Sequence, residues 1–536
     1  MRILFVVLIL IAIAGGLIAL LVLRRAGRER EAVPAGARAG ELTCIRGSRK
    51  VGDASYRAEN GTLVVPENRS APSSRLIALP VTRVFSPDPN PAEPIFYLAG
   101  GPGMSNMKFR PPTWLLAHHD VVMVGYRGVD GTPKLEGPEI AQAMKGVDGD
   151  ALSPASIAKV RRALSATAAR LQSEGIDLTG YTMPETVADM EAARQALGYS
   201  SVDLLSESYG TRVAQIYAYL HPERIHRSIM IGVNAPGHLV WEPAVTDAQV
   251  RQYAALYRRQ NEEGEVVTDL AETMRRVNRS MPARWLFVPI DPGKVKTVAF
   301  VMLFHRTSAP IVFDAYRAAE RGDASGLALM SVAFDWMLPS MMTWGEFFAI
   351  GSSADFDPAR DYARDLAPAD SILGAPLSLL AWAGAAEGWP IHRIDDELRR
   401  VHRSDVETLL VSGSIDFSTP ADIATRELLP SLSRGRQVIL SERGHVADFW
   451  HFQPAAAERL VTSFYDTGAA DDSRYAYLPM DFTPALRFPM LAKILLGTGV
   501  LLVVALGAAF AAIARRARSA WHARAARGET IPTTSN

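Results

Sequence analysis

Apolar and polar positions divide the chain into two membrane-like ends and a long central region. Residues 3–23 form an uncharged apolar run, and residues 490–514 form a second run with one lysine near its start. A helix needs about 20 residues to cross a bilayer, so both runs are long enough to span one. The pattern predicts an N-terminal transmembrane anchor at 1–23, linkers at 24–44 and 469–489, a C-terminal transmembrane helix at 490–514 and a basic tail at 515–536.

Both ends have alternative interpretations. The A-x-A pattern at 35–37 could be a signal-peptide cleavage site, but it lies well beyond the apolar run, which favours an uncleaved anchor. The second run could be a buried core helix, but "RRAR" follows it directly. The arginine-rich tail favours a cytoplasmic C-terminus, whereas the flank "RRAGRER" at 24–30 favours the opposite orientation. Because the tail is the denser cluster, we predict an inner-membrane protein with an extracytoplasmic central domain.

Strand-like and helix-like patterns alternate in the first part of the central region. The strand-like runs are at 62–65, 76–84, 94–98, 119–124, 201–207 and 227–232, and the helical patterns are at 184–197 and 209–222. The first helix begins with proline and acidic residues and ends at a glycine, as helices commonly do. This βαβαβ order predicts a mostly parallel sheet with helices on both faces.

A helical block then interrupts the sheet pattern. It covers residues 237–400, after which strand-like runs return at 406–414 and 436–442. We therefore expect a helical lid inserted between two core segments, 45–236 and 401–468. The aromatic and methionine residues of the lid suit either its own core or substrate contact, and the lid core is favoured for most of them: Trp336, Met341, Met342, Trp344, Phe347 and Phe348.

Composition excludes several other functions. Basic and acidic residues number 57 each, so the whole chain offers no electrostatic basis for binding nucleic acid. The one cysteine, Cys44, excludes an intrachain disulfide and a multi-cysteine metal site.

A candidate nucleophile lies between the fifth strand and its helix. Residues 206–210 read Ser-Glu-Ser-Tyr-Gly, close to the G-x-S-x-G motif in which a sharp turn exposes a serine. Ser206 replaces the first glycine and is small enough for the turn. The alternative for Ser208 is an ordinary polar residue at a strand-to-helix connection.

Two further residues suit a serine nucleophile. A serine hydroxyl needs a histidine to accept its proton, and the histidine needs a carboxylate to fix its tautomer. Asp416 and His445 follow the last two strands, in the chain order Ser, Asp, His of α/β-hydrolases. The alternative to a catalytic role is a turn-capping aspartate for Asp416 and a hydrogen-bonded surface histidine for His445.

The loop "YLAGGPGMS" at 97–105 suggests an oxyanion hole. Acyl transfer places negative charge on the substrate carbonyl oxygen, and two backbone N–H groups can stabilise it. Tyr209, directly after Ser208, would supply one, and Gly101 the other. Pro102 has no N–H.

These motifs, with "GYRGVDGT" at 125–132, "SESYGT", the insertion, "GSIDFSTP" and "GH", resemble the α/β-hydrolase family of proline iminopeptidases and tripeptidyl aminopeptidases over roughly residues 61–465. The resemblance implies a Ser208, Asp416 and His445 triad, hydrolysis near peptide N-termini through an acyl-enzyme, and no metal or organic cofactor. The chain departs from the family's HGGPG loop, which here reads LAGGPG, lacks the cysteines of secreted relatives, and carries membrane spans outside the family outline.

The expected partners are a peptide or small ester substrate and the lipid bilayer. No nucleic acid is expected to bind. The sequence does not predict the oligomeric state. An aminopeptidase must hold the substrate amine, for which Glu346 and Asp355 of the lid are candidates. The alternatives are a membrane-associated carboxylesterase or lipase-like hydrolase, and a non-catalytic binding protein on the same fold.

Overall fold

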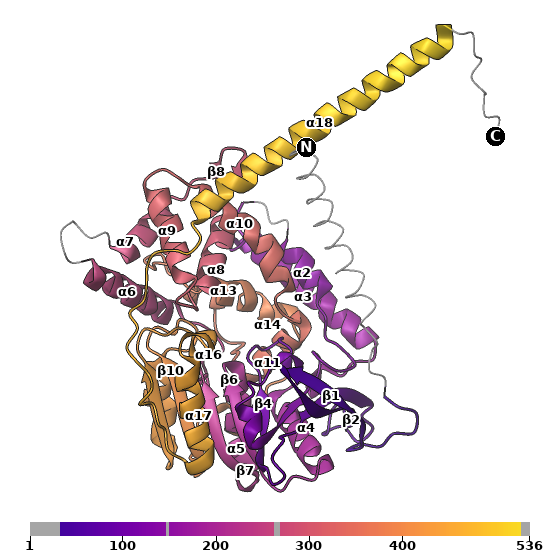
Figure 1. The fold of residues 1–536 in the computed structure, drawn as a ribbon, viewed down its shortest axis with the longest axis vertical. Helices are drawn as coiled ribbons and strands as arrows, with labels where there is room; N and C mark the ends of the chain where they lie inside the picture. Colours follow the sequence, from indigo (N-terminus) through magenta and orange to yellow (C-terminus); the bar gives the residue numbers. More distant parts are fainter. Residues whose placement is uncertain (1–32, 146–148, 262–268, 527–536) are drawn as a thin grey trace.

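The computed structural model describes residues 33–145, 149–261 and 269–526 (Figure 1). The N-terminal anchor predicted at 1–23 lies outside these residues. The described chain forms a core built on a nine-stranded sheet, a lid above it, and one long helix, α18 (Phe488–Ala526), which extends away from the lid.

The sheet is mostly parallel, as the sequence predicts. Its order is β1-β2-β3-β5-β4-β6-β7-β10-β11. The run from β5 to β11 is parallel, whereas β1, β2 and β3 pair antiparallel and join it through β5. The strands are β1 (Leu42–Val51), β2 (Ala54–Pro66), β3 (Leu76–Val84), β4 (Ala92–Leu98), β5 (His119–Val124), β6 (Val202–Glu207), β7 (Ile225–Ile231), β10 (Glu407–Gly413) and β11 (Gly435–Leu440).

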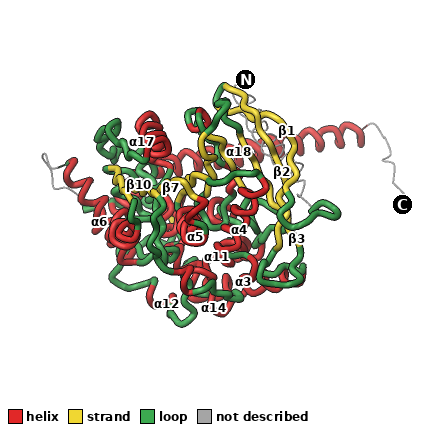
Figure 2. Tube along the Cα trace, turned by 90° about the horizontal axis from the view of Figure 1, so that it is seen from below, coloured by secondary structure: helices red, strands yellow, loops and turns green. Residues whose placement is uncertain are grey.

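Burial explains the long apolar runs of the central strands. Every residue of β5 and β10 is buried, as expected for strands covered on both faces. Helices α4 (Met183–Ala196) and α5 (Tyr209–Leu220) lie on one side of the strands, and α17 (Pro454–Thr467) lies on the other (Figure 2). The carboxyl ends of β4, β6, β10 and β11 therefore meet at one edge.

The lid has its own hydrophobic core. Its helices are α6 (Pro243–Gln260), α7 (Leu270–Arg279), α8 (Pro292–Met302), α9 (Ala309–Glu320), α10 (Ser325–Met337), α11 (Trp344–Ala354), α12 (Tyr362–Asp365), α13 (Pro376–Trp382) and α14 (Ala385–Gly388). Two features add to the mostly helical lid expected at 237–400. A small hairpin, β8 (Arg284–Trp285) and β9 (Val288–Pro289), lies within it, and helices α2 (Pro138–Met144) and α3 (Pro154–Ser173), which precede β6, share its core.

The lid aromatics divide into two groups. Trp344, Phe347 and Phe348 are buried, as expected for lid core, whereas Trp336 is 80% exposed. Trp336 lies at the end of α10, on the outside of the lid.

The predicted linkers are more ordered than expected. Residues 42–44, assigned above to the first linker, begin β1, because the strand pairs with β2 along its whole length. The second linker, 469–489, has no helix or strand before α18 begins at Phe488, yet it is anchored. Glu442 of the core accepts from Tyr477 Oη and Met480 N, both at 2.6 Å, and Arg306 of the lid donates to the carbonyls of residues 478 and 479. The segment therefore ties the lid to the core.

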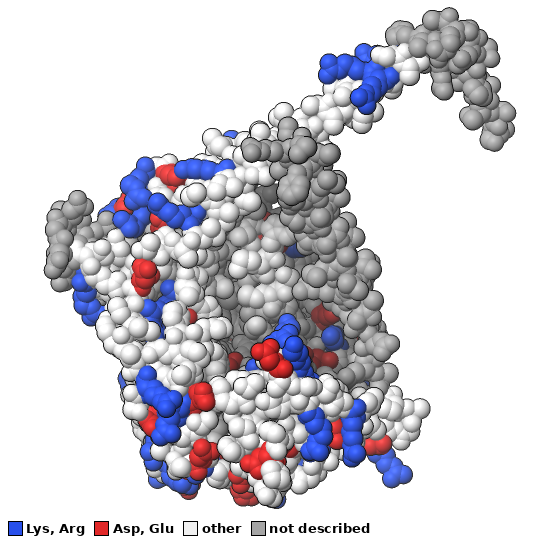
Figure 3. Space-filling model, in the orientation of Figure 1, with Lys and Arg blue, Asp and Glu red and all other residues white. Residues whose placement is uncertain are grey.

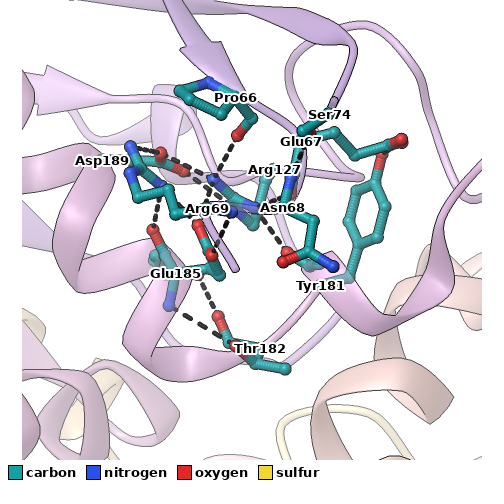
Figure 4. Close-up of polar contacts among 12 residues, drawn as sticks. Pro66, Glu67, Asn68, Arg69, Ser74, Arg127, Tyr181, Thr182, Glu185 and Asp189 are labelled. Atoms are coloured by element: carbon teal, nitrogen blue, oxygen red, sulfur yellow. Dashed lines mark hydrogen bonds and ion pairs between the residues drawn. The ribbon is translucent and has the colours of Figure 1, made fainter. Parts of the chain in front are cut away.

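A buried arginine organises the turn after β5 (Figure 4). Arg127, from the "GYRG" motif, is fully buried and binds both oxygens of Asp189, at 2.7 and 2.8 Å. It also donates to the carbonyl oxygens of Glu67 and Gly180. Because these partners belong to three different segments, this one side chain connects the end of β2 and α4 to the turn after β5, beside the glycine loop at 97–105.

Candidate active site

Ser208 occupies the sharp turn between β6 and α5. Its φ is 50° and its ψ is −120°, a region that non-glycine residues seldom adopt and that is typical of exposed nucleophiles on such turns. The Ser208 N–H donates to the Ile231 carbonyl at 2.9 Å, and the Thr211 hydroxyl donates to the Ser208 carbonyl at 2.6 Å. The backbone of the turn is held from both sides.

The residues flanking Ser208 explain the motif. A Cβ added to Gly210 would lie 2.2 Å from the Leu98 carbonyl oxygen, so only glycine fits there. Ser206, which replaces the usual first glycine, is fully buried and donates to the Ile229 carbonyl at 3.0 Å. This substitution therefore creates a hydrogen bond to β7.

Asp416 and His445 form a hydrogen-bonded pair at the carboxyl ends of β10 and β11. His445 Nδ1 lies 2.8 Å from Asp416 Oδ2 and 3.1 Å from Oδ1. Asp416 is fully buried and accepts from the backbone N–H groups of Ser418 and Thr419 at 2.9 and 2.8 Å. Because the carboxylate can only accept, Nδ1 carries the proton, and Nε2 is left as a proton acceptor.

The His445 ring packs beside the Ser208 turn. A Cβ on Gly232 would lie 3.0 Å from His445 Cε1, and Gly232 follows Ile231, whose carbonyl holds Ser208 N–H. Within the described chain the Ser208 hydroxyl makes no hydrogen bond to His445. The three side chains predicted from the sequence are thus gathered at one sheet edge, with a hydrogen bond between Asp416 and His445 and none between Ser208 and His445.

The two predicted oxyanion donors flank Ser208. A Cβ on Gly100 would lie 3.2 Å from Ser208 Cβ, so the glycine loop packs directly on the serine. Gly101 has a φ of 139°, and its N–H makes no hydrogen bond within the described residues. Tyr209 is the first residue of α5, so its N–H has no partner inside the helix. Both groups are free to bind a substrate oxygen.

Asn106 holds the glycine loop and was not singled out from the sequence. It is fully buried, accepts from Ala99 N at 2.7 Å and donates to the carbonyls of Tyr97 and Val124 at 2.9 and 2.7 Å. An asparagine after a glycine loop is also typical of an ordinary turn, so its position along the chain carries no distinctive signal.

The side chains of the lid acids Glu346 and Asp355 are both buried. Asp355 lies 3.5 Å from Arg212 and accepts from Leu239 N at 2.9 Å. Glu346 accepts from the Gly103 N–H, and burial raises its pKa to about 8. Among the described residues, neither carboxylate lines the cavity beside Ser208. Both instead contact residues that surround the site: Arg212 and Leu239 for Asp355, and Gly103 for Glu346.

The cavity beside Ser208 is small, with a volume of about 20 Å³. Its walls are largely apolar and aromatic, and they come from both the core and the lid: Gly101, Pro102, Ser208, Tyr209, Asn234, His238, Leu239, Trp241, Phe347, Gly351, Trp382 and Ser418. The lid therefore determines what can reach the serine.

Comparisons with known proteins give a family and distant relatives. Residues 93–346 match the model of the alpha/beta hydrolase fold. The tripeptidyl aminopeptidases of Streptomyces lividans and Streptomyces coelicolor are 26% identical over 205 residues, which is 35% of this chain and 38% of theirs. The match thus covers well under half the length of these curated relatives.

Solved structures give a weaker likeness. A serine hydrolase from Cycloclasticus zankles has a TM-score of 0.34 and 11% identity, covering 80% of this chain and 100% of that one. A thermophilic esterase from Thermogutta terrifontis has a TM-score of 0.33 and 14% identity, covering 76% and 98%. The sheet order and the match to the family model together show an α/β-hydrolase fold, and part of the chain resembles the tripeptidyl aminopeptidases.

Proposed function

We propose that this protein is a membrane-anchored serine hydrolase in which Ser208 is the nucleophile, His445 the general base and Asp416 the residue that orients it. The observation that carries the proposal is the hydrogen-bonded Asp416–His445 pair beside a serine with positive φ at a strand-to-helix turn. Ser208 Oγ attacks the substrate carbonyl as its proton passes to His445 Nε2. Gly101 and Tyr209 N–H groups stabilise the oxyanion. His445 then protonates the leaving group, and water hydrolyses the acyl-enzyme.

We further propose that the substrate is a peptide with a free N-terminus. The likeness to tripeptidyl aminopeptidases supports this. A specific observation favours the rival ester substrate: none of the described residues lining the cavity is Asp or Glu, so its wall offers no carboxylate for a substrate amine.

Paired substrates distinguish these activities. The full chain in detergent would be assayed on tripeptidyl and prolyl amides, on their N-acetylated forms, and on short and medium acyl esters. Cleavage that requires the free amine supports an aminopeptidase, whereas turnover of esters alone supports the carboxylesterase. In both cases Ser208→Ala abolishes turnover, and equal turnover by both proteins would exclude Ser208 as the nucleophile.

Membrane anchoring is supported by α18. Its segment Phe488–Ala520 contains an 18-residue stretch that has a mean hydropathy of 2.5 and is not buried in the protein. Figure 3 shows the helix as a largely uncharged rod that ends in a basic group, formed by Arg515, Arg516 and Arg518. Its first turns pack on α10, where Lys493 pairs with Asp323 at 2.6 Å. The lid is therefore the part of the hydrolase attached to the proposed span.

Side chains around the base of α18 also suit a membrane surface. The turn of the β8–β9 hairpin exposes Leu286 and Phe287, at 61% and 71%, and α10, which contacts both the hairpin and α18, exposes Trp336. Exposed aromatic and leucine side chains are typical of protein surfaces at the lipid–water interface. We propose that the lid faces the bilayer on the extracytoplasmic side.

The single cysteine tests the orientation. Cys44 is exposed and belongs to the core. A membrane-impermeant maleimide should label it in intact spheroplasts if the domain is extracytoplasmic. Labelling only after lysis would place the domain on the cytoplasmic side, and Cys44→Ser controls for background labelling.

A further inference from the structure

A second group of titratable side chains lies at the opposite edge of the sheet from Ser208. Four neighbouring strands, β5, β4, β6 and β7, each contribute one residue from their first two positions: His119, Glu93, Asp203 and His226. None of them takes part in the proposed hydrolysis, because Asp203 lies at the start of β6 and Ser208 follows its end.

The spacing of three of these side chains matches a metal site. One ligand atom each from Glu93, Asp203 and His226 lies within 4.8 Å of the others. His226 Nδ1 is 3.1 Å from Asp203 Oδ1 and 3.5 Å from Glu93 Oε2. Ligand atoms about 2.1 Å from a tetrahedral zinc ion lie roughly 3.4 Å apart. The two separations from His226 are thus close to those that such an ion imposes, and the third is no more than 4.8 Å.

The buried carboxylate of Asp203 is a second, independent indication of a cation site. Its side chain is fully buried, and its Oδ2 has no hydrogen-bond partner among the described residues. His119 Nδ1 is 3.8 Å from Oδ2, too far for a hydrogen bond, and lies 2.7 Å from the Glu93 carbonyl, to which it donates. Burial raises the pKa of Asp203, opposed by the neighbouring histidines His226 and His119.

A comparison within the protein shows what Asp203 lacks. Asp189 is also buried, but both its oxygens are bound by the guanidinium of Arg127. No arginine or lysine among the described residues forms an ion pair with Asp203; its ionic neighbours are the two histidines. A buried carboxylate without a permanent positive partner is costly, and a bound cation would remove that cost.

We infer that Glu93, Asp203 and His226 form a divalent-cation site at the amino-terminal edge of the sheet, with zinc as the best-fitting ion. One imidazole nitrogen and two carboxylate oxygens are ligands that zinc favours, and water can fill the fourth position. Glu93 and His226 are partly exposed, which leaves a path for the ion. The ion would cross-link β4, β6 and β7 and so stiffen the strand that presents Ser208.

Zinc binding by the full chain in detergent tests the inference. Protein stripped with a chelator is dialysed against buffered Zn²⁺, and bound zinc is measured by mass spectrometry alongside the melting temperature. We expect one zinc ion per chain and a higher melting temperature. His226→Gln and Glu93→Gln should each weaken zinc binding by about tenfold or more and abolish the thermal shift. Because both residues are partly exposed, these variants should fold even if Asp203→Asn does not.

A nearby histidine–carboxylate pair provides the matched control. His118 Nδ1 lies 3.0 Å from Asp88 Oδ2 on the surface, and His118→Gln should leave zinc binding unchanged. The inference is overturned if the unaltered protein binds no zinc. It is also overturned if His226→Gln and Glu93→Gln bind zinc as tightly as the unaltered protein. In either case the cluster is a histidine–carboxylate pair alone. Hydrolase activity need not change in any of these outcomes, so the test is independent of the proposed function.

Discussion

The Thr343 backbone N–H donates to the Gly103 carbonyl oxygen at 2.8 Å, and this bond joins the lid to the glycine loop. Glu346, in the first turn of the lid helix α11 that follows Thr343, accepts from the Gly103 N–H. The loop that carries the proposed oxyanion donor Gly101 is therefore bonded to the start of the lid helix α11 and, within the core, to Asn106. A displacement of the lid should alter the oxyanion site as well as access to the cavity.

Asp416→Asn should lower kcat strongly with little change in folding. The amide can donate to His445 Nδ1 and so favours the tautomer in which Nε2 is protonated and cannot accept the Ser208 proton. The fall in kcat is expected to be on the order of 10⁴-fold, measured on the best substrate found. Asp422→Asn, an exposed aspartate six residues later, should keep full activity. A similar kcat in both variants would remove Asp416 from the proposed triad.

Gly210→Ala should destabilise the protein and disturb the Ser208 turn. The added methyl would lie 2.2 Å from the Leu98 carbonyl oxygen, and because both are held in the core the backbone must shift. Overpacking of this kind costs about 1–3 kcal/mol, measurable by chemical denaturation. Gly47→Ala in β1, where the added Cβ meets nothing within 4 Å, is the control. Equal stability of the two variants would contradict the inference that Gly210 has no room for a side chain.

Glu346 should make stability depend on pH. Burial raises its pKa from 4.5 to about 8, so the folded protein retains a proton that the unfolded chain loses. Between these two values the unfolded state binds fewer protons, and this contribution to stability falls as the pH rises. Glu346→Gln should therefore reduce the loss of melting temperature between about pH 5 and pH 8. Glu387→Gln, at an exposed lid position, should leave the profile unchanged, and an unchanged profile for Glu346→Gln would refute the assignment.

Arg127→Ala should be strongly destabilising. It leaves the buried Asp189 without the guanidinium that binds both its oxygens, and breaking a buried pair typically costs about 3–5 kcal/mol. Arg46, whose side chain is 89% exposed, also pairs with a carboxylate, at 3.5 Å to Glu59, and Arg46→Ala should cost less than about 1 kcal/mol. Urea denaturation of both variants measures the loss in free energy of unfolding. Equal losses would show that burial of Arg127 does not determine how much it stabilises the protein.

The sequence by itself determined the parallel sheet, the position of the lid insertion, and Ser208, Asp416 and His445 as residues at strand ends. These are local properties: hydrophobic runs mark buried strands, and glycine and small residues mark the turns that follow them. The carboxyl ends of parallel strands share an edge, so chain order alone brings the three side chains to one region.

Only the tertiary structure decided what holds that region together. Asn106, Arg127 and Glu346 contact segments far away in the chain, and a polar residue that will be buried against distant backbone has the same local pattern as one in a surface turn. The cluster of Glu93, Asp203 and His226 was missed for the same reason, since each residue begins a separate strand and only the strand order places them together. Pairing between distant segments depends on the packing of the whole chain, which periodicity along the sequence does not encode.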